Sequence, residues 1–289
     1  LLEHQHQKYG DWVIHNQHLP GGWGFSEVNT INPDIDDTTS SLRSIARSVQ
    51  MNNSLQQSWE KGINWLLSMQ NDDGGWAAFE KNIKNKWIEF LPIEKAEFLL
   101  SDPSTADLTG RTIEFLGNYT NLSPNHPVIK KAVDWLIKNQ EKDGSWYGRW
   151  GICYIYGTWA AVTGLSSVGL LPSDSSLQSA AKWLKSIQNP DGGWGESCRS
   201  DGEKKYVALN ESTLTHTAWA LDSLISVSEQ PNSEIQKGIS YLLDSIDKHD
   251  WTSDYPKGQG MAGAFYIQYH SYRYIFPLLA LSHYQQKYK

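Results

Sequence analysis

A short pattern recurs along the sequence, and a chain that repeats itself in this way folds as a series of similar structural units. Each full copy has the order aromatic residue, Leu, Gln, Gly, Trp, and three copies align without gaps. The three copies run from Trp65-Leu66 through Gln70 to Trp76, from Trp135-Leu136 through Gln140 to Trp146, and from Trp183-Leu184 through Gln188 to Trp194. The repeat limits the chain to an array of like elements.

Two further copies are degenerate. A fourth, which ends at Trp251, has Ile246 where the others have Gln. A fifth is cut short at the N-terminus, where Gln5 is followed by Trp12. We expect the Gln amide of each copy to bond to the backbone at a neighbouring helix end while the indole packs beside it, which would tie adjacent units together.

Each copy begins with a helical pattern of apolar residues and ends in a turn of Asn, Asp and Gly, which predicts a helix stopped by a glycine-rich loop. A second helical stretch follows every loop and is more apolar, which indicates an inner ring of buried helices wrapped by an outer amphipathic ring. The second stretches span residues 37–49, 108–119, 154–168, 212–227 and 266–285. The sequence therefore predicts an all-α fold, an α/α toroid of helical hairpins that lacks its first helix. An open solenoid of hairpins is the alternative.

The composition bounds the class of protein. A net charge of −7 without a basic block argues against a nucleic-acid partner. The cysteines, Cys153 and Cys198, are too few for a disulfide scaffold and lack the close pairing of a zinc site, so a reducing cytoplasm is expected. No apolar stretch approaches the ~20 residues that span a bilayer, so any membrane contact would be peripheral. No linker composition interrupts residues 1–289, which are expected to form one domain.

The acidic run Asp34-Ile35-Asp36-Asp37 is the strongest candidate for chemistry. Its three carboxylates at the start of a helix repel one another, and burial raises the pKa of at least one so that it holds a proton near neutral pH. Such a group can protonate an alkene, a very weak base that has to be held in a cavity without water. In the alternative interpretation, Asp36 or Asp37 only caps a helix that begins at Thr38. No basic cluster accompanies the run, so a magnesium–diphosphate site is disfavoured and we expect no metal.

The repeats and the acidic run, which is preceded by Gly21-Gly22-Trp23-Gly24-Phe25, resemble the QW repeats and the DxDD motif of the squalene-hopene cyclases. These enzymes are class II terpene cyclases, and the resemblance extends over nearly the whole chain. It implies a catalytic α/α barrel in which the middle aspartate, Asp36, protonates a hydrophobic polyprene. Asp34 and Asp37 would orient Asp36 and hold negative charge nearby. The resemblance implies no cofactor.

The resemblance also implies partners outside the chain. The cavity of these enzymes lies between two barrels, so we expect a missing N-terminal barrel, in keeping with a sequence that starts abruptly without Met. Squalene, or a related polyprene such as tetraprenyl-curcumene, is the expected substrate, and a polycyclic triterpenoid is the expected product. Members from spore-forming bacteria act on polyprenes that already carry a ring. We expect peripheral membrane contact in the full-length enzyme, while a homodimer stays open.

Aromatic residues fall at positions that match those of the family, where ring faces stabilise the carbocation that travels along the polyene. By resemblance these residues are Phe25, Phe79, Trp150, Tyr156, Phe265, Tyr269 and Tyr272. For any single one of them, core packing is an equally good explanation.

Two departures from the family pattern bear on mechanism and product. Arg111 stands where hopene-forming members have a histidine bonded to the catalytic aspartate. A fixed cation there would stabilise the ionised carboxylate, unless Arg111 pairs with Asp107, Asp34 or Asp37 instead. Met261 replaces an aromatic residue that the hopene-forming enzymes place near late cations.

Other functions stay open at this stage. A carbohydrate-active α/α toroid would also carry paired carboxylates, but it would place its Trp residues in exposed grooves. A prenyltransferase-like zinc site would need a third ligand beside Cys198 and His216. The chain alone could also be catalytically silent and act only by packing or binding. Residues 90–100 lie where the family has a constriction on the path of the substrate, although a covered surface loop is the simpler explanation.

Overall fold

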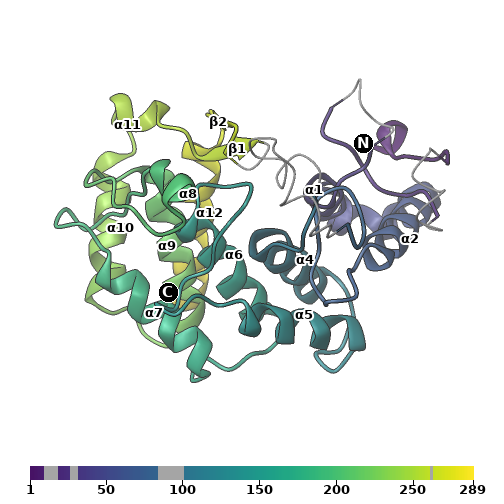
Figure 1. The fold of residues 1–289 in the computed structure, drawn as a ribbon, viewed down its shortest axis with the longest axis horizontal. Coiled ribbons are helices and arrows are strands. Elements are labelled where there is room, and N and C mark those ends of the chain that lie inside the picture. The colour runs from purple at the N-terminus through teal and green to yellow at the C-terminus, as the bar shows by residue number, and fades with distance from the viewer. Residues whose placement is uncertain (10–18, 27–31, 84–100, 261–262) are drawn as a thin grey trace, which may run out of the picture.

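The computed structural model describes residues 1–9, 19–26, 32–83, 101–260 and 263–289. The outer helices are α2 (Asn53–Ser68), α5 (Pro127–Lys138), α7 (Ser175–Ser186) and α10 (Ser233–Ser245). The inner helices are α1 (Ile35–Ile45), α4 (Ala106–Tyr119), α6 (Tyr154–Ser167), α9 (Leu214–Val227) and α12 (Tyr272–Tyr288). In Figure 1 the hairpins follow one another in an arc, from α1 and α2 on the right to α10 and α12 on the left.

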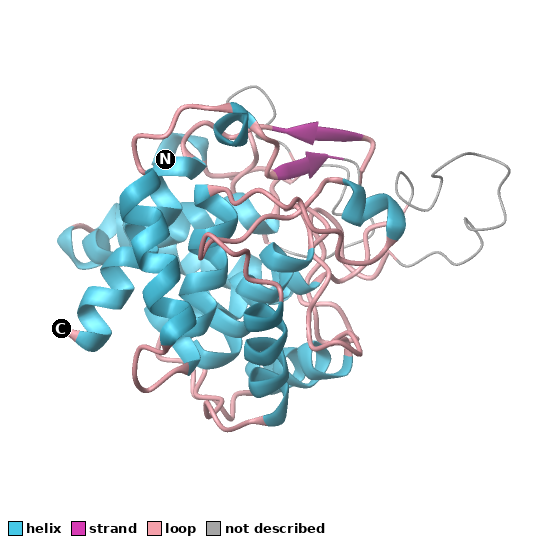
Figure 2. Cartoon of the chain, turned by 90° about the vertical axis from the view of Figure 1, so that its left-hand side faces the viewer, coloured by secondary structure: helices cyan, strands magenta, loops and turns pink. Residues whose placement is uncertain are grey.

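Shorter elements lie in the connections. They are the 3₁₀ helices η1 (Leu2–His4) and η3 (Ala46–Met51), the helices α8 (Arg199–Glu203) and α11 (Trp251–Asp254), and the strands β1 (Gly258–Gly260) and β2 (Phe265–Ile267). The two strands pair antiparallel, with Gly258 opposite Ile267. Figure 2 shows them at the upper edge of the helical body.

Each inner helix packs against the next, α1 on α4, α4 on α6, α6 on α9 and α9 on α12. Almost every residue of α6 and α9 is buried, whereas α5 and α10 bury only one stripe. The buried apolar side chains form one continuous cluster. The predicted α/α toroid, with a buried inner layer and an amphipathic outer layer, is confirmed.

The last inner helix begins later than predicted. We expected a helix from residue 266, but Phe265–Ile267 form strand β2 and α12 begins only at Tyr272. Glycines on the partner strand permit this pairing, because a Cβ atom at Gly260 would lie 2.2 Å from the ring of Phe265. The helical pattern in the sequence therefore included Tyr266 and Ile267, which close packing against β1 holds in a strand.

Glutamine side chains tie each hairpin to the next. The Nε2 groups of Gln70, Gln140 and Gln188 each donate two hydrogen bonds of 2.8–2.9 Å, one to their own glycine loop and one to the following outer helix. The acceptors on the following helices are the backbone carbonyls of Val128, Ser176 and Glu234, which all lie in a first helical turn. The predicted role of the Gln residues is confirmed.

The tryptophan of each full repeat is held from two sides. Its indole Nε1 donates to the carbonyl of the repeat leucine, as in the 2.8 Å bond from Trp146 to Leu136. Its backbone N–H donates to a threonine hydroxyl on the next inner helix, as in the 3.0 Å bond to Thr158. Trp76 and Trp194 make the same two bonds. Each inner helix is therefore fixed to the loop that precedes it.

The N-terminal copy ends at a different tryptophan from the one we predicted. Gln5 donates to the carbonyls of Gly21 and Ser58, at 2.7 and 2.8 Å. Trp23 makes the indole bond, 2.9 Å to the carbonyl of Leu1. Trp12 lies outside the described residues, and its assignment to the repeat is wrong because Trp23 has the contacts that define the position. Extra residues between Gln5 and Gly21 concealed the match.

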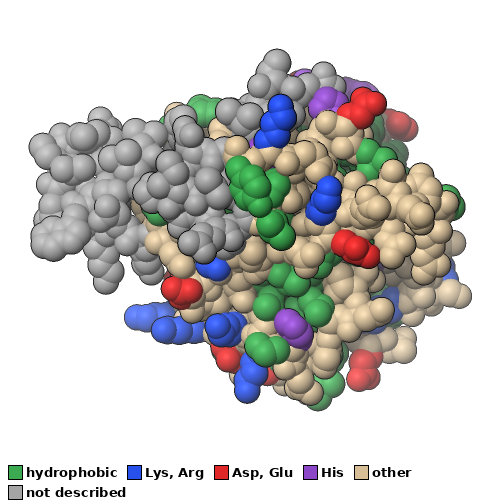
Figure 3. All heavy atoms as spheres, turned by 90° about the vertical axis from the view of Figure 1, so that its right-hand side faces the viewer, with side chains coloured by type: hydrophobic (Ala, Val, Ile, Leu, Met, Phe, Trp, Pro, Cys, Tyr) green, Lys and Arg blue, Asp and Glu red, His purple; other side chains and the backbone are tan. Residues whose placement is uncertain are grey.

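The surface carries mixed charge on the face formed by the N-terminal hairpins, where acidic and basic side chains are interspersed (Figure 3). Among the described residues, no helix has both the length and the apolar content needed to cross a membrane.

The repeat loops turn through glycines that hold left-handed conformations. Gly74, Gly144 and Gly192 have φ angles of +100°, +98° and +88°. A Cβ atom at Gly144 would lie 2.6 Å from the carbonyl oxygen of Ser179 on the next outer helix. Both the backbone conformation and the close approach require glycine.

Gly144→Ala should lower the free energy of unfolding by about 2 kcal/mol or more, because it combines a left-handed residue with a steric overlap. Gly202→Ala is the matched control, since a Cβ atom there would meet no atom within 4 Å. Denaturant unfolding of both variants measures the difference. Equal stability of the two variants would contradict the assigned role of the loop.

Candidate active site

The three aspartates of the acidic run lie at the start of α1, and Asp34 is the residue that caps this helix. Its backbone is extended, and its Oδ1 accepts a hydrogen bond of 2.8 Å from the N–H of Asp37. The interpretation that Asp36 or Asp37 caps a helix beginning at Thr38 is wrong, because Asp34 already has the conformation and the bond of a cap. Asp36 and Asp37 therefore lie in the first helical turn.

Two repeat loops hold this end of α1. The backbone N–H of Asp34 donates to the carbonyl of Trp23 at 2.9 Å, and that of Ile35 donates to the carbonyl of Ala78 at 3.0 Å. Trp23 and Ala78 belong to the loops of successive repeats. The acidic turn thus lies where two loops meet, and the same bonds that build the toroid fix its position.

Asp34 and Asp37 form a carboxyl pair. Burial raises the pKa of Asp34 well above its usual range, and the charge of Asp37 and a hydrogen bond between the two carboxyl groups raise it further. Burial also raises the pKa of Asp37, although the bond with Asp34 acts in the opposite direction. Of the two, Asp34 is the more buried, and its pKa is raised further.

Asp36 has a different partner. Its Oδ1 accepts a hydrogen bond of 2.9 Å from Nε of Arg111 on α4, and the two side chains are 41% and 15% exposed, respectively. Burial acts to lower the pKa of Arg111, but the charge of Asp36 outweighs it, so the pKa lies above the usual range for arginine. Of the pairings left open by the sequence, the structure shows the one between Arg111 and Asp36. The guanidinium group of Arg111, which stays charged, therefore binds one carboxylate oxygen of Asp36.

Asp107, expected to tune the acid, accepts hydrogen bonds from backbone N–H groups and interacts electrostatically with Asp36. It is fully buried, and its oxygens accept hydrogen bonds from the N–H groups of Leu108 at 3.0 Å and Trp150 at 2.8 Å. Burial raises its pKa, against the effect of these bonds. Asp107 therefore positions the segment that carries Trp150.

A second buried carboxylate, missed in the sequence, holds the other end of that segment. Glu196 accepts hydrogen bonds of 2.8–3.1 Å from the backbone N–H groups of Cys153, Tyr154 and Ile155 at the start of α6. Burial raises the pKa of Glu196, and these bonds oppose the rise. A lone glutamate in the Gly-Trp-Gly-Glu sequence after the repeat gave no signal of this long-range contact.

Five aromatic rings gather on the inner helices beside Arg111. Tyr156 lies 4.8 Å from Trp219 and 5.6 Å from Trp159, and Tyr272 lies 4.9 Å from Phe276, measured between ring centres. Trp159 and Trp219 both contact Phe276 edge to face. The guanidinium carbon of Arg111 is 5.4 Å from the ring centre of Trp159. The structure thus brings the predicted Tyr156 and Tyr272 close to the ion pair.

Trp159, Trp219 and Phe276 were not among the predicted site residues. Helical spacing could have found two of them, because Trp159 follows Tyr156 by three positions and Phe276 follows Tyr272 by four. Burial raises the pKa of Tyr156 well above its usual range, so its hydroxyl stays neutral.

The other predicted aromatics lie nearer the surface. Phe25, Phe79 and Phe265 are exposed, with Phe25 at 70%. Phe79 contacts Trp150 edge to face at 5.9 Å. Tyr269 stacks on Tyr272 at 4.6 Å and so extends the inner cluster outward. Met261 and residues 90–100 lie outside the described residues.

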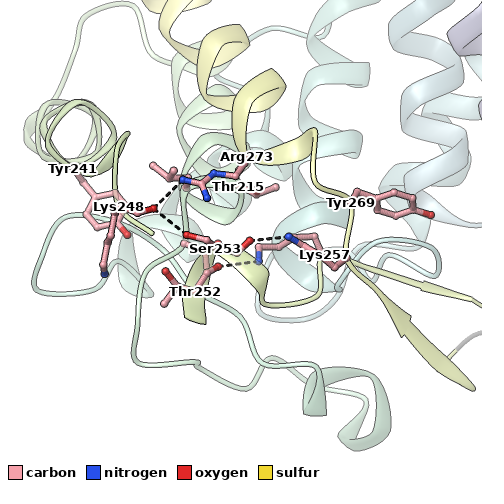
Figure 4. A pocket seen from close by; sticks show the side chains of 11 residues that line it. Thr215, Tyr241, Lys248, Thr252, Ser253, Lys257, Tyr269 and Arg273 are labelled. Atoms are coloured by element: carbon pink, nitrogen blue, oxygen red, sulfur yellow. Dashed lines mark hydrogen bonds between the residues drawn. The ribbon is translucent and has the colours of Figure 1, made fainter. Parts of the chain in front are cut away.

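A polar pocket near α11 is distinct from the acidic turn (Figure 4). Arg273 donates to the carbonyl of Lys248 at 2.8 Å, and Lys257 donates to that of Thr252 at 3.5 Å. Burial lowers the pKa of Lys257 to about 7. Tyr269 points away from Lys257 in Figure 4. The two basic side chains bind backbone carbonyls, so the pocket holds the α11 turn in place.

The family model of the squalene-hopene cyclase C-terminal domain matches residues 1–286. The chain belongs to the squalene-hopene cyclase family. This membership favours a cyclase over the carbohydrate-active toroid that the sequence left open.

Two curated relatives illustrate the family. Sporulenol synthase of Bacillus subtilis (strain 168) is 51% identical over 285 residues, which cover 98% of this chain and 44% of the synthase. The squalene–hopene cyclase of Zymomonas mobilis subsp. mobilis is 40% identical over 283 residues, which cover 96% of this chain and 43% of the cyclase. The chain therefore spans less than half the length of these relatives.

A solved structure shows the same fold. A variant of the type II terpene cyclase MstE from Scytonema, in complex with merosterolic acid A, superposes with a TM-score of 0.64 at 15% identity. The match covers 96% of this chain and 79% of that one. At this identity the likeness supports the α/α toroid and nothing finer.

Asp34→Asn should flatten the pH dependence of stability. Because the folded-state pKa of Asp34 is raised, the folded wild type binds the proton more tightly, and it loses stability as pH rises from about 3.9 through that pKa. Asparagine keeps the cap acceptor and is always neutral. Denaturant unfolding between pH 4 and neutrality should show that the free energy of unfolding of the variant increases, relative to that of the wild type, as pH rises.

The matched control is Asp174→Asn at the cap of α7, which also accepts a first-turn N–H, that of Ser176. If Asp34→Asn and the wild type kept a constant difference in stability across this range, the raised pKa of Asp34 would be wrongly assigned.

Proposed function

We propose that the protein containing this chain is a class II terpene cyclase, in which Asp36 starts the reaction by protonating a terminal alkene of a hydrophobic polyprene. The observation that carries the proposal is the ion pair between Asp36 and the buried Arg111, beside an aromatic cluster, in a chain of the squalene-hopene cyclase family. The Asp36 side chain is more exposed than that of Arg111, so Asp36 is the member of the ion pair that can meet a substrate.

The proposed proton transfer uses the oxygen of Asp36 that does not accept the bond from Arg111 Nε. The alkene π electrons form a bond to the proton on Oδ2 of Asp36, the O–H electrons stay on the carboxylate, and a tertiary carbocation results. Arg111, held on Oδ1 at 2.9 Å, stabilises the carboxylate left behind. Asp34 and Asp37 lie at the same helix start, and because burial raises the pKa of Asp34, this pair is the proposed source of the proton that reloads Asp36.

The carbocation then needs stabilisation without capture. The rings of Tyr156, Trp159 and Tyr272 offer π faces close to the acid, and burial raises the pKa of both tyrosines, so no phenolate is available to trap the cation. Phe25, Phe79, Trp150, Phe265 and Tyr269 would serve cations formed farther along the chain.

Squalene or a related polyprene of similar length, such as tetraprenyl-curcumene, is the proposed substrate, and a polycyclic triterpenoid is the proposed product. The high identity to sporulenol synthase supports testing a polyprene that already carries a ring. Met261, where hopene-forming members have an aromatic residue near late cations, supports a product that differs from theirs.

The remaining assignments concern the whole protein. We infer that residues 1–289 act as one domain that encloses the substrate together with an N-terminal barrel, and exposed Phe25, Phe79 and Phe265 supply apolar surface for that purpose. A bilayer-soluble substrate supports a cytoplasmic protein in peripheral contact with a membrane. The reaction as written requires no cofactor or metal.

Asp36→Asn in the full-length protein should reduce cyclised product at least about 100-fold with both squalene and tetraprenyl-curcumene, because an amide cannot deliver the proton. Gas chromatography with mass detection measures the products. Asp174→Asn, the cap of α7, should retain wild-type activity. Undiminished product from Asp36→Asn would refute the acid, and no product from the wild type with either substrate would refute the substrate class.

A further inference from the structure

A line of contacts leads from the ion pair to the opposite end of the inner helices. Arg111, bonded to Asp36, lies over Trp159 at 5.4 Å. Nε1 of Trp159 donates to Oδ2 of Asp222 at 2.8 Å, and Oδ1 of Asp222 lies 2.6 Å from Nδ1 of His283. The five residues come from α1, α4, α6, α9 and α12 in turn, so each of these inner helices contributes one member.

Charge alternates along this line. Asp36 and Asp222 are acids, Arg111 and a protonated His283 are cations, and the indole of Trp159 lies between Arg111 and Asp222. Asp222 is buried, and a buried carboxylate needs partners of this kind. A hydrogen bond to an anion polarises the indole and makes its ring face more negative, which strengthens its attraction for the guanidinium group.

Asp222 also fixes the orientation of the indole. Trp159 is held edge to face by Phe276 at 5.3 Å and stacked on Trp219 at 6.1 Å, but rings alone leave its N–H without an acceptor. The bond to Asp222 gives the indole a single direction, and in that direction its face lies towards Arg111.

We propose that Asp222 and His283 are positioning residues for the acid: protonated His283 holds Asp222, Asp222 orients and polarises Trp159, and Trp159 keeps Arg111 on Asp36. The proposal rests on the proposed function for its effect on turnover. Neither residue touches the reacting atoms, and both lie outside the set of residues expected from the family resemblance.

The surroundings of His283 give the line a pH dependence. Asp222 faces it from α9 and Glu114 from α4, while Lys287 follows on α12 and donates to backbone carbonyls at the end of α9. Glu114 is itself paired with Arg43. The bond with Asp222 raises the pKa of His283 above 6.5. The cation is present at low pH and is lost as pH rises through the raised pKa, and its side chain is 43% exposed to solvent.

Side-chain NMR of the full-length protein labelled with ¹⁵N at Arg and Trp tests the line without substrate. Arg111→Lys and Trp159→Phe identify the Arg111 Nε–H and Trp159 Nε1–H signals by their loss. In the wild type both signals should shift with pH and share one midpoint above 6.5. In His283→Gln that shift should vanish, whereas His4→Gln, a change at an exposed histidine of η1, should leave it intact.

Two variants of Asp222 separate orientation from charge. Asp222→Asn keeps an acceptor for Trp159, so the Arg111 signal should stay near its wild-type position but lose its pH response. Asp222→Leu removes the acceptor, so the signal should move at every pH. If the Arg111 Nε–H signal and its pH response are the same in wild type, His283→Gln and Asp222→Leu, the proposal is overturned, even if the Trp159 signal changes.

Turnover supplies the second readout. The wild-type kcat should fall as pH rises through the His283 midpoint, and His283→Gln should lose this pH limb with KM unchanged. If kcat of His283→Gln still falls over the same pH range, the proposed effect of His283 on turnover is wrong. Absence of any cyclised product would refute the proposed function alone, because the NMR signals still decide whether the line exists.

Discussion

The paired hydrogen bonds of the repeat glutamines determine where every other group in the molecule lies. Each amide joins its own loop to the first turn of the next outer helix, and the following tryptophan joins that loop to the next inner helix. A few recurring polar bonds therefore join successive hairpins in the same way each time. The inner helices meet around one centre because these bonds recur, and the acidic turn is carried on the first of them.

Within that turn, three aspartates have three different electrostatic situations. Asp34 is buried and its pKa is strongly raised, Asp37 lies beside it with a smaller rise in pKa, and Asp36 is half-exposed and bound to a cation. The differences do not come from the residues, which are identical, but from which of them the helix start turns inward. A helical turn rotates successive side chains by about 100°, so neighbours in sequence face a backbone loop, a carboxyl partner and Arg111.

The repeats allowed the fold to be predicted because each copy contains both its helix pattern and its loop glycine. Element boundaries were less predictable where packing outweighed the helical pattern, as at strand β2. The tryptophan of the N-terminal copy was also missed, because extra residues separate Gln5 from Trp23 and Trp12 lies close to the expected spacing. The acidic run was recognisable because its members are adjacent. The family resemblance placed Arg111 beside the acid, but it did not decide which carboxylate Arg111 binds, since Arg111 lies 75 positions from Asp36 and four carboxylates were available to it. Glu196 and Asp222 gave no local signal, because their partners are distant in sequence.

Asp107 and Glu196 anchor the segment between them only through backbone N–H groups. Backbone groups are the same for every amino acid except proline, so these anchors do not depend on the side chains at the bonded positions. Gly151 is the exception in the segment, because a Cβ atom there would lie 2.1 Å from the ring of Tyr156. The chain can therefore exchange an aromatic ring in this segment for another residue while the path of the backbone stays the same. In evolutionary terms, the side chains of this segment can change under selection while the acidic turn keeps its place.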